Sequence, residues 1–171
     1  NYYTPQTVTV AAVDDALQQG TSTKTITHSI TSGDGSFNGI SAPSVSVVVV
    51  DNDSPAVALT ESSGSTAVTE GGATDSIDVS VTTTPSSTVQ VSVSFDTAQI
   101  KINGSSVSPV SLSFSAANTP QTLTVTAVDD SVIEGPHASD LSFTVTSSDA
   151  QYNGFSVSPV TVSITDNDIS P

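Results

Sequence analysis

The sequence predicts an all-β protein with the architecture of an antiparallel β-sandwich. Apolar residues recur at every second position in nearly every segment, with Ser and Thr between them. This is the period of a strand that buries one face and exposes the other. Turn signals, among them Gly71-Gly72, Asn103-Gly104 and Asn153-Gly154, separate the alternating segments. No segment has the period of a helix flanked by capping residues.

The alternation places the expected strands in order along the chain. After residue 54, the predicted inward residues are Ile77, Val79, Val81; Val89, Val91, Val93, Phe95; Val110, Leu112, Phe114; Leu123, Val125, Ala127; Leu141, Phe143, Val145; and Val160, Val162, Ile164. Before residue 54, they are Val8, Val10; Ile26, His28, Ile30; and Val45, Val47, Val49. Six or seven strands in about 115 residues is the size of an immunoglobulin-like (Ig-like) sandwich.

The chain contains an internal repeat. TPQTVTVAAVDD, at residues 4–15, matches TPQTLTVTAVDD, at residues 119–130, which is an offset of 115 residues. The same offset pairs FNG at residues 37–39 with YNG at 152–154, and DND at 51–53 with DND at 166–168. A fixed period of this kind is typical of a tandem array. We therefore expect the native protein to be such an array, of which this chain is a part.

The repeat divides the chain into two predicted domains. Residues 55–171 form one complete copy, and residues 1–54 correspond only to the C-terminal half of another copy. Half a sandwich exposes an apolar face and unpaired edges, so we expect it to be covered. The cover could come from the same copy upstream, which the native array favours, or from another chain by strand addition.

Composition excludes several classes of function. Asp and Glu number 17 against 2 Lys and no Arg, which gives a net charge of −15, and Cys, Met and Trp are absent. Without a basic surface the chain is not expected to bind nucleic acid or an anionic membrane, and no tract is long enough to insert into a membrane. The absence of Cys excludes disulfides and thiolate metal sites. No nucleophile motif such as GxSxG is present, so no enzyme activity is expected.

The acidic residues gather where predicted strands end. Asp129 and Asp130 follow one strand, Glu134 comes shortly after, Asp166 and Asp168 close the last strand, and Glu70 precedes Gly71-Gly72. Clustered carboxylates on irregular loops are typical Ca²⁺ ligands. Asp and Asn also favour turns for local reasons, which is the alternative for any one of them. The paired Asp and the DND triplet recur in both copies at identical spacing, which turn chemistry explains less well.

Four elements of the complete copy resemble those of Calx-beta repeats: VTEGG at 68–72, AVDDSVIEGPH at 127–137, SSDAQYNG at 147–154 and VTVSITDND at 160–168. These are calcium-binding sandwich modules of sodium–calcium exchangers that also occur in tandem in large bacterial surface proteins. The resemblance implies Ca²⁺ as cofactor. It implies these ligands: Glu70, Asp129, Asp130, Glu134, Asp166 and Asp168. A family Asp after the third strand is missing, because this chain has KINGSS at 101–106.

The half copy keeps only part of the implied ligand set. Asp14, Asp15, Asp51 and Asp53 are present, but Gln19 stands at the equivalent of Glu134, and the counterpart of Glu70 is expected in the half of that copy that lies outside this chain. A second, weaker site is therefore expected there. Because residues 51–53 lead directly into the next copy, a cation held by them would restrict the junction.

The sequence thus predicts a structural, secreted module at the cell surface, stabilised by calcium. Its expected partners are neighbouring repeats of the same chain or identical chains. An adhesin stalk, a surface layer and a homopolymeric fibre, in which one chain completes the half sandwich of the next, all fit this prediction. A glycan- or partner-binding module of a secreted protein is the alternative. A glycan-binding module would require an exposed aromatic cluster, for which the only tyrosines are Tyr2, Tyr3 and Tyr152.

Overall fold

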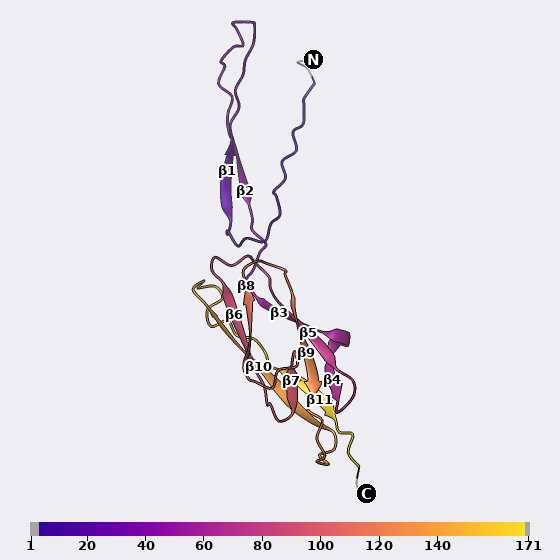
Figure 1. The fold of residues 1–171 in the computed structure, drawn as a ribbon. Coiled ribbons are helices and arrows are strands. Elements are labelled where there is room, and N and C mark those ends of the chain that lie inside the picture. Colours follow the sequence, from indigo (N-terminus) through magenta and orange to yellow (C-terminus); the bar gives the residue numbers. More distant parts are fainter. Residues whose placement is uncertain (1–3, 170–171) are drawn as a thin grey trace. The chain divides into compact units, whose positions relative to one another are not determined.

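The structure is a computed structural model that describes residues 4–169. The chain forms two compact units, unit 1 (Asn1–Asp53) and unit 2 (Ser54–Pro171), which are described separately below. The described residues of both units form strands, turns and loops, with one short 3₁₀ helix in unit 2 (Figure 1). Among the described residues, no helix has the length and apolar character that a membrane crossing requires. The predicted all-β fold class is confirmed.

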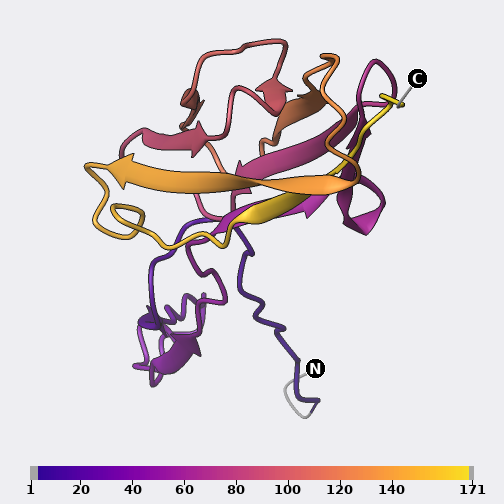
Figure 2. The same ribbon diagram turned by 90° about the horizontal axis from the view of Figure 1, so that it is seen from below.

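Unit 2 is a sandwich of two sheets. Its elements are β3 (Val57–Glu61), η1 (Ser62–Gly64), β4 (Thr66–Thr69), β5 (Asp75–Val81), β6 (Val89–Ser94), β7 (Ile100–Ile102), β8 (Val110–Phe114), β9 (Gln121–Ala127), β10 (His137–Ser147) and β11 (Val160–Thr165). One sheet has the order β4-β11-β10-β6-β8, and the other has the order β3-β5-β9-β7. The pairing is antiparallel except between β11 and β4, which run parallel. The long orange strand β10 and the yellow strand β11 lie side by side in Figure 2.

The core lies between the sheets and follows the alternation in the sequence. Buried and more exposed positions alternate along β5, β6, β9 and β11. The largest fully buried side chains include Tyr152, Phe114, Ile77 and Leu123. Burial of one apolar face per sheet is the main stabilising contribution in such a fold. Because β10 is long enough to pair with both β11 and β6, it connects the C-terminal half of the unit to the strands that precede residue 118.

Unit 1 forms one hairpin, made of β1 (Ser22–Ile26) and β2 (Val45–Val49). The predicted strand at Val8 and Val10 is absent, and of the strand predicted at Ile26, His28 and Ile30 only Ile26 lies in a strand, β1. Residues 4–21 and 27–32 have no strand. The physical reason can be seen in the corresponding segments of unit 2, which are residues 119–127 and 142–147. β9 pairs with β5 and β7, and the second half of β10 pairs with β6, so these segments are paired only by strands that come before residue 118. The described residues of unit 1, 4–53, contain no equivalent of those strands.

Candidate metal centre

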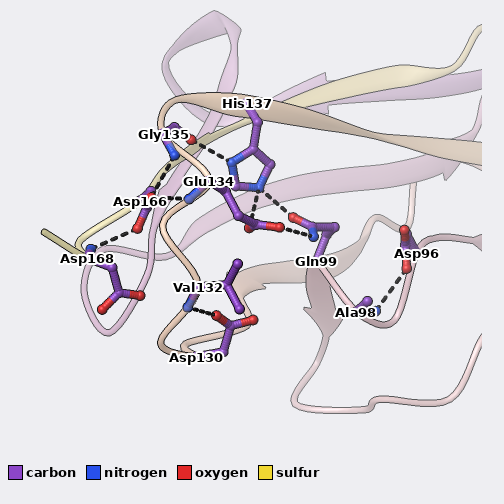
Figure 3. A network of polar contacts seen from close by, with 10 residues as sticks. All are labelled: Asp96, Ala98, Gln99, Asp130, Val132, Glu134, Gly135, His137, Asp166 and Asp168. Carbon is purple, nitrogen blue, oxygen red and sulfur yellow. Dashed lines mark hydrogen bonds and ion pairs between the residues drawn. The ribbon is translucent and has the colours of Figure 1, made fainter. Parts of the chain in front are cut away.

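The parallel pairing of β4 and β11 brings their carboxyl ends together at one end of unit 2. Glu70 directly follows β4, and its backbone N–H donates to the carbonyl oxygen of Thr165 at 3.0 Å. Asp166 and Asp168 directly follow β11. The loop between β9 and β10 approaches the same end and carries Glu134. Residues that are far apart in sequence therefore meet here (Figure 3).

Asp166 organises the backbone of this site. Its carboxylate accepts hydrogen bonds from the N–H groups of Glu134 and Gly135, both at 2.6 Å, and of Asp168 at 2.7 Å (Figure 3). These bonds favour the charged form, and they hold the pKa of Asp166 below its ordinary value, chiefly through the N–H of Asp168. Asp166 thus fixes the loop before β10 against the end of β11.

Glu70 is the buried carboxylate of the site. Its relative exposure is 3 %, and its Oε2 accepts no hydrogen bond from the described residues. Burial raises the pKa of Glu70, and the negative charges of Asp166, Asp130, Glu134 and Asp168 raise it further. A buried, unpaired carboxylate surrounded by like charges is costly unless a cation compensates it.

Asp168 is in the same situation. Its Oδ2 also accepts no hydrogen bond from the described part of the chain. Burial raises its pKa, and the charges of Asp166, Asp130 and Asp129 add to the effect. Two neighbouring carboxylates with free oxygen atoms therefore face an environment that disfavours their ionised forms.

Two groups of side chains place potential ligand atoms within 4.8 Å of one another. One group is Glu70, Asp166 and Asp168, and the other is Glu70, Glu134 and His137. Glu70 belongs to both, so it lies at the centre of the cluster. Carboxylate oxygens in this number suit a hard cation such as Ca²⁺, which accepts six to eight oxygen ligands in irregular geometry.

His137 is held beside this cluster by its own contacts. Its Nδ1 lies 2.8 Å from the carbonyl oxygen of Gly135, and its Nε2 lies 3.4 Å from Glu134 Oε2 and contacts the side-chain oxygen of Gln99. Gln99 Nε2 also donates to Glu134 Oε1 at 3.1 Å, which completes the network in Figure 3. Both ring nitrogens of His137 are engaged, so the ring orients Glu134 more directly than it offers a free ligand atom.

The structure brings four of the six predicted ligands into these groups and leaves two beside them. Asp130 Oδ1 accepts the N–H of Val132 at 2.6 Å, and Asp129 Oδ1 accepts Asn167 Nδ2 at 3.2 Å. Their charges still reach the site, as the pKa of Asp168 shows. The close approach requires Gly71, which has a positive φ of 59° and where a Cβ would meet Asp129 Oδ1 at 3.0 Å.

Sequence reasoning did not assign roles to Asn167 and Gln99. Asn167 Nδ2 donates to the carbonyl oxygen of Glu70 at 3.0 Å and so connects the two strand ends. The DND triplet indicates such a role, because its central Asn is an amide donor between two carboxylate acceptors. Gln99 lies on a different segment, before β7, and no motif in the sequence connects it to Glu134.

In unit 1 the corresponding residues also lie near one another. Asp51 Oδ2 accepts the N–H groups of Gln19 and Gly20 at 2.5 Å, as Asp166 does for its counterparts. The pKa of Asp53 is raised by burial and by the charges of Asp51, Asp14 and Asp15. Gln19 Nε2 donates to Asp15 Oδ2 at 3.0 Å, at the position where unit 2 has a carboxylate. Within the described residues, this end of unit 1 forms no ligand group like the two in unit 2.

The fold and the site define a class of protein: an all-β sandwich module with an acidic cluster at one end. No protein-family model matches the chain, and no curated protein sequence matches it. Among solved structures, the apo form of the Calx CBD1 domain is similar, with 20 % identity and a TM-score of 0.45, over 66 % of this chain and 98 % of that domain.

Two further solved structures show weaker similarity to the chain. The calcium binding domain CBD12 of CALX1.1 has 20 % identity and a TM-score of 0.43, and the match covers 65 % of this chain and 45 % of that one. Domains 4 and 5 of the S-layer protein SbsC have 13 % identity and a TM-score of 0.33, over 91 % of this chain and 81 % of theirs.

Proposed function

We propose that this chain is a structural module of a protein displayed outside the cell, and that Ca²⁺ bound at the acidic end of unit 2 stabilises its fold. The observation that carries the proposal is Glu70, which is buried, has an unpartnered oxygen and is surrounded by carboxylates. Among the described residues, the one ion pair at this end is that of Glu134 with His137. A divalent cation would provide the missing positive charge.

The chemistry of the donor set favours calcium over other metals. Glu70, Asp166, Asp168 and Glu134 offer hard oxygen atoms on strand ends and loops. Zinc prefers nitrogen and sulfur ligands, but the chain has no Cys, and both ring nitrogens of His137 have other partners. Magnesium requires a rigid octahedron and keeps most of its water. Calcium tolerates the irregular arrangement that these loops present.

A structural role follows from what such binding would achieve. Binding to the folded state alone, at ten times the dissociation constant, stabilises it by about 1.4 kcal/mol. In a domain of this size, that corresponds to a rise of roughly 5 °C in melting temperature. Dissociation constants on the order of 10⁻⁴ to 10⁻³ M, common for extracellular calcium modules, would confine the effect to the outside of a cell. Such a module suits a surface layer, a stalk and a fibre alike.

The glycan-binding alternative has little support from the aromatic residues. Tyr152 is the one tyrosine within the described residues, and it is fully buried in the core of unit 2. Tyr2 and Tyr3 lie outside the described residues. A sugar platform needs a cluster of exposed aromatic faces. Tyr152 offers none, and Phe37, at 59 % exposure, is the one aromatic side chain among the exposed large apolar residues of the described part of the chain.

The test is calorimetric unfolding of the full chain in EDTA and in millimolar calcium, with Glu70→Gln as the variant. Glu70→Gln preserves the shape of the side chain and removes its charge. In EDTA the variant should melt at a higher temperature than the natural chain, because a buried repulsive charge is gone. In calcium the variant should lack the stabilisation that the natural chain gains. The natural chain should then have the higher melting temperature of the two.

Glu61→Gln is the matched control. Glu61 closes β3 and accepts a hydrogen bond from the Thr66 hydroxyl at 2.7 Å, which a glutamine oxygen can also accept. It belongs to neither ligand group. The control should keep the full calcium response. The proposal is contradicted if calcium does not change the melting temperature of the natural chain. It is also contradicted if Glu61→Gln loses the calcium-dependent rise in melting temperature as Glu70→Gln does.

A further inference from the structure

The carboxylates at the acidic end of unit 2 differ in whether the protein itself provides them with a hydrogen-bond donor. In the described part of the chain, the buried side-chain oxygen atoms that lack a partner are Glu70 Oε2 and Asp168 Oδ2. Both belong to the same ligand group, together with Asp166. The need for a compensating cation is therefore concentrated at this one group.

Glu134, in the other ligand group, already has partners from side chains. Gln99 Nε2 donates to Glu134 Oε1 at 3.1 Å, and His137 Nε2 lies 3.4 Å from Glu134 Oε2 (Figure 3). Glu134 is also exposed, so water can hydrate its carboxylate. This residue therefore does not require a cation of its own.

Asn167 provides the same kind of partner for Asp129. Its Nδ2 lies 3.0 Å from the carbonyl oxygen of Glu70 and 3.2 Å from Asp129 Oδ1. A carbonyl and a carboxylate both accept hydrogen bonds, so the NH₂ group of the amide must face them, with one N–H for each oxygen. Ca²⁺ binds carbonyl and carboxylate oxygen atoms of this kind on irregular loops. The amide thus occupies a place that would otherwise suit an ion.

This place lies between the two sheets of unit 2 and is closed on one side by the backbone. Glu70 follows β4 and Asp129 follows β9, and these strands belong to different sheets. A Cβ at Gly71 would lie 3.0 Å from both Asn167 Nδ2 and Asp129 Oδ1. The amide is therefore packed directly against Gly71, and an ion could enter only if the amide left.

We propose that unit 2 binds a single Ca²⁺, at the ligand group of Glu70, Asp166 and Asp168. Asn167 limits the number of ions to one, because its amide occupies the place where a second ion would bridge Asp129 and the Glu70 carbonyl. This inference rests on the proposed function and adds to it the number of ions and the residue that sets that number. It also means that the amide connects the two sheets at this end when calcium is absent.

Asn167→Asp is the informative variant, because it replaces the donor with an acceptor of nearly the same shape. The Asp129 carboxylate and the Glu70 carbonyl would then face a further carboxylate instead of two N–H groups. In EDTA the variant should have a lower melting temperature than the natural chain, since it loses two hydrogen bonds and gains a repulsive charge. In calcium it should bind one ion more, because the added oxygen atoms complete a second site.

Two matched controls separate the place of the charge from the charge itself. The double variant Asn167→Asp with Asp129→Asn has the composition and net charge of the natural chain, and it only exchanges the acid and the amide. It should bind the same number of ions as the natural chain. Asn153→Asp adds a charge in the loop between β10 and β11, at the end of β10 opposite His137, where its Oδ1 accepts the N–H of Ser147 at 3.4 Å. A carboxylate can also accept this bond, so the ion number should not change.

The experiment counts Ca²⁺ on the full chain by native mass spectrometry and follows unit 2 by NMR during a calcium titration. The acidic residues of unit 1 are the same in all four proteins, so the difference in ion number between them reports on unit 2. The amide signals of Glu134, Gly135 and Asp168, whose N–H groups donate to Asp166, should follow one binding step in the natural chain. Asn167→Asp should add a second step and one ion.

The outcomes distinguish this inference from the function on which it rests. Two binding steps at unit 2 of the natural chain would overturn the inference without any variant, and the proposed function would stand. An unchanged ion number in Asn167→Asp, or the same gain in Asn153→Asp or in the double variant, would overturn it as well. If no Ca²⁺ binds to unit 2 of the natural chain, the proposed function is wrong and the inference is wrong with it.

Discussion

The turn at Asp34 in unit 1 and the turn at Asp149 in unit 2 have the same backbone hydrogen bonds. The N–H of Phe37 donates to the carbonyl of Asp34 at 3.0 Å, and the N–H of Tyr152 donates to that of Asp149 at 3.1 Å. Yet Phe37 is 59 % exposed, whereas Tyr152 is fully buried. Short-range hydrogen bonds therefore form in both units, while burial occurs only in the unit with both halves of the sandwich.

The acidic ends show the same contrast. Asp51 and Asp166 accept equivalent backbone N–H groups, and burial and repulsion raise the pKa of both Asp53 and Asp168. Only unit 2 has a Glu that enters from the other half of the sandwich, at the end of β4. The loops before each hairpin thus adopt their form locally, and the complete cluster requires a residue that is remote in sequence.

The largest expected difference between the units comes from core truncation at equivalent positions. Val125→Ala removes two methyl groups from a fully buried position and should lower the unfolding free energy of unit 2 by about 2–3 kcal/mol. Val10→Ala makes the same change where the side chain is 53 % exposed, and it should change the melting temperature of unit 2 very little. Calorimetry of both variants of the full chain measures the difference.

Equal destabilisation by the two valine variants would show that unit 1 is covered in solution.

A smaller difference is expected from Tyr152, in the loop between β10 and β11, whose hydroxyl contacts the segment after β5. The hydroxyl of Tyr152 accepts the N–H of Thr83 at 3.0 Å and donates to the carbonyl oxygen of Thr83 at 3.0 Å. Tyr152→Phe leaves these buried groups unpaired and should cost about 1–2 kcal/mol. The reciprocal variant, Phe37→Tyr, adds a hydroxyl at an exposed position and should leave stability unchanged. Urea unfolding distinguishes them, and loss of stability in both would contradict the contrast.

The alternation in the sequence predicted which residues face the core of unit 2, because the strand period fixes the side-chain direction. It could not predict whether a strand forms. Residues 4–12 and 119–127 have nearly the same sequence, yet only the second segment is a strand, β9, because only it has partners on both sides. The short strands β3, β4 and β7 have few alternating residues, and their positions depend on pairing with distant strands.

The sequence predicted that the candidate site is acidic, but it predicted only some of the residues that form the two ligand groups. Glu70, Glu134, Asp166 and Asp168 were expected from the acidic residues at predicted strand ends and from the resemblance to Calx-beta repeats, and they meet in the structure. Asp129 and Asp130 come from the same motif, but hydrogen bonds to Asn167 and Val132 hold them beside the ligand groups. Which oxygens of a loop turn inward depends on these contacts, and spacing alone does not encode them.

The next prediction concerns a carboxylate that connects the halves of unit 2. Asp149 accepts the N–H of Gln151 at 2.9 Å and that of Ser86, in the loop between β5 and β6, at 2.8 Å, and these bonds lower its pKa. Asp34 accepts the N–H of Ser36 within its own turn. Asp149→Asn should therefore destabilise unit 2 by about 1 kcal/mol, and Asp34→Asn should have no effect on it. Thermal unfolding of the two variants tests this, and an equal effect would mean that the contact with Ser86 contributes nothing.

The smallest expected effect is a pH dependence whose sign changes with calcium. Burial and repulsion raise the folded-state pKa of Glu70 above 4.5 and that of Asp168 above 3.8, so the metal-free folded state binds protons more readily than the unfolded state. In a chelator, the melting temperature of unit 2 should therefore rise as pH falls from 7 toward 5. Below about pH 4 it should fall, because the lowered pKa values of Asp166 and Asp149 then oppose folding.

In calcium the same acidification should lower the melting temperature from the start, because protons compete with the cation for ionised carboxylates. Glu70→Gln separates this site from the general effect of the −15 charge, which also weakens as pH falls. In a chelator the variant should show a smaller rise between pH 7 and pH 5 than the natural chain. An identical rise in melting temperature in both proteins would mean that Glu70 does not titrate in this range. The cost of burying its carboxylate would then have to be compensated by something other than a metal ion.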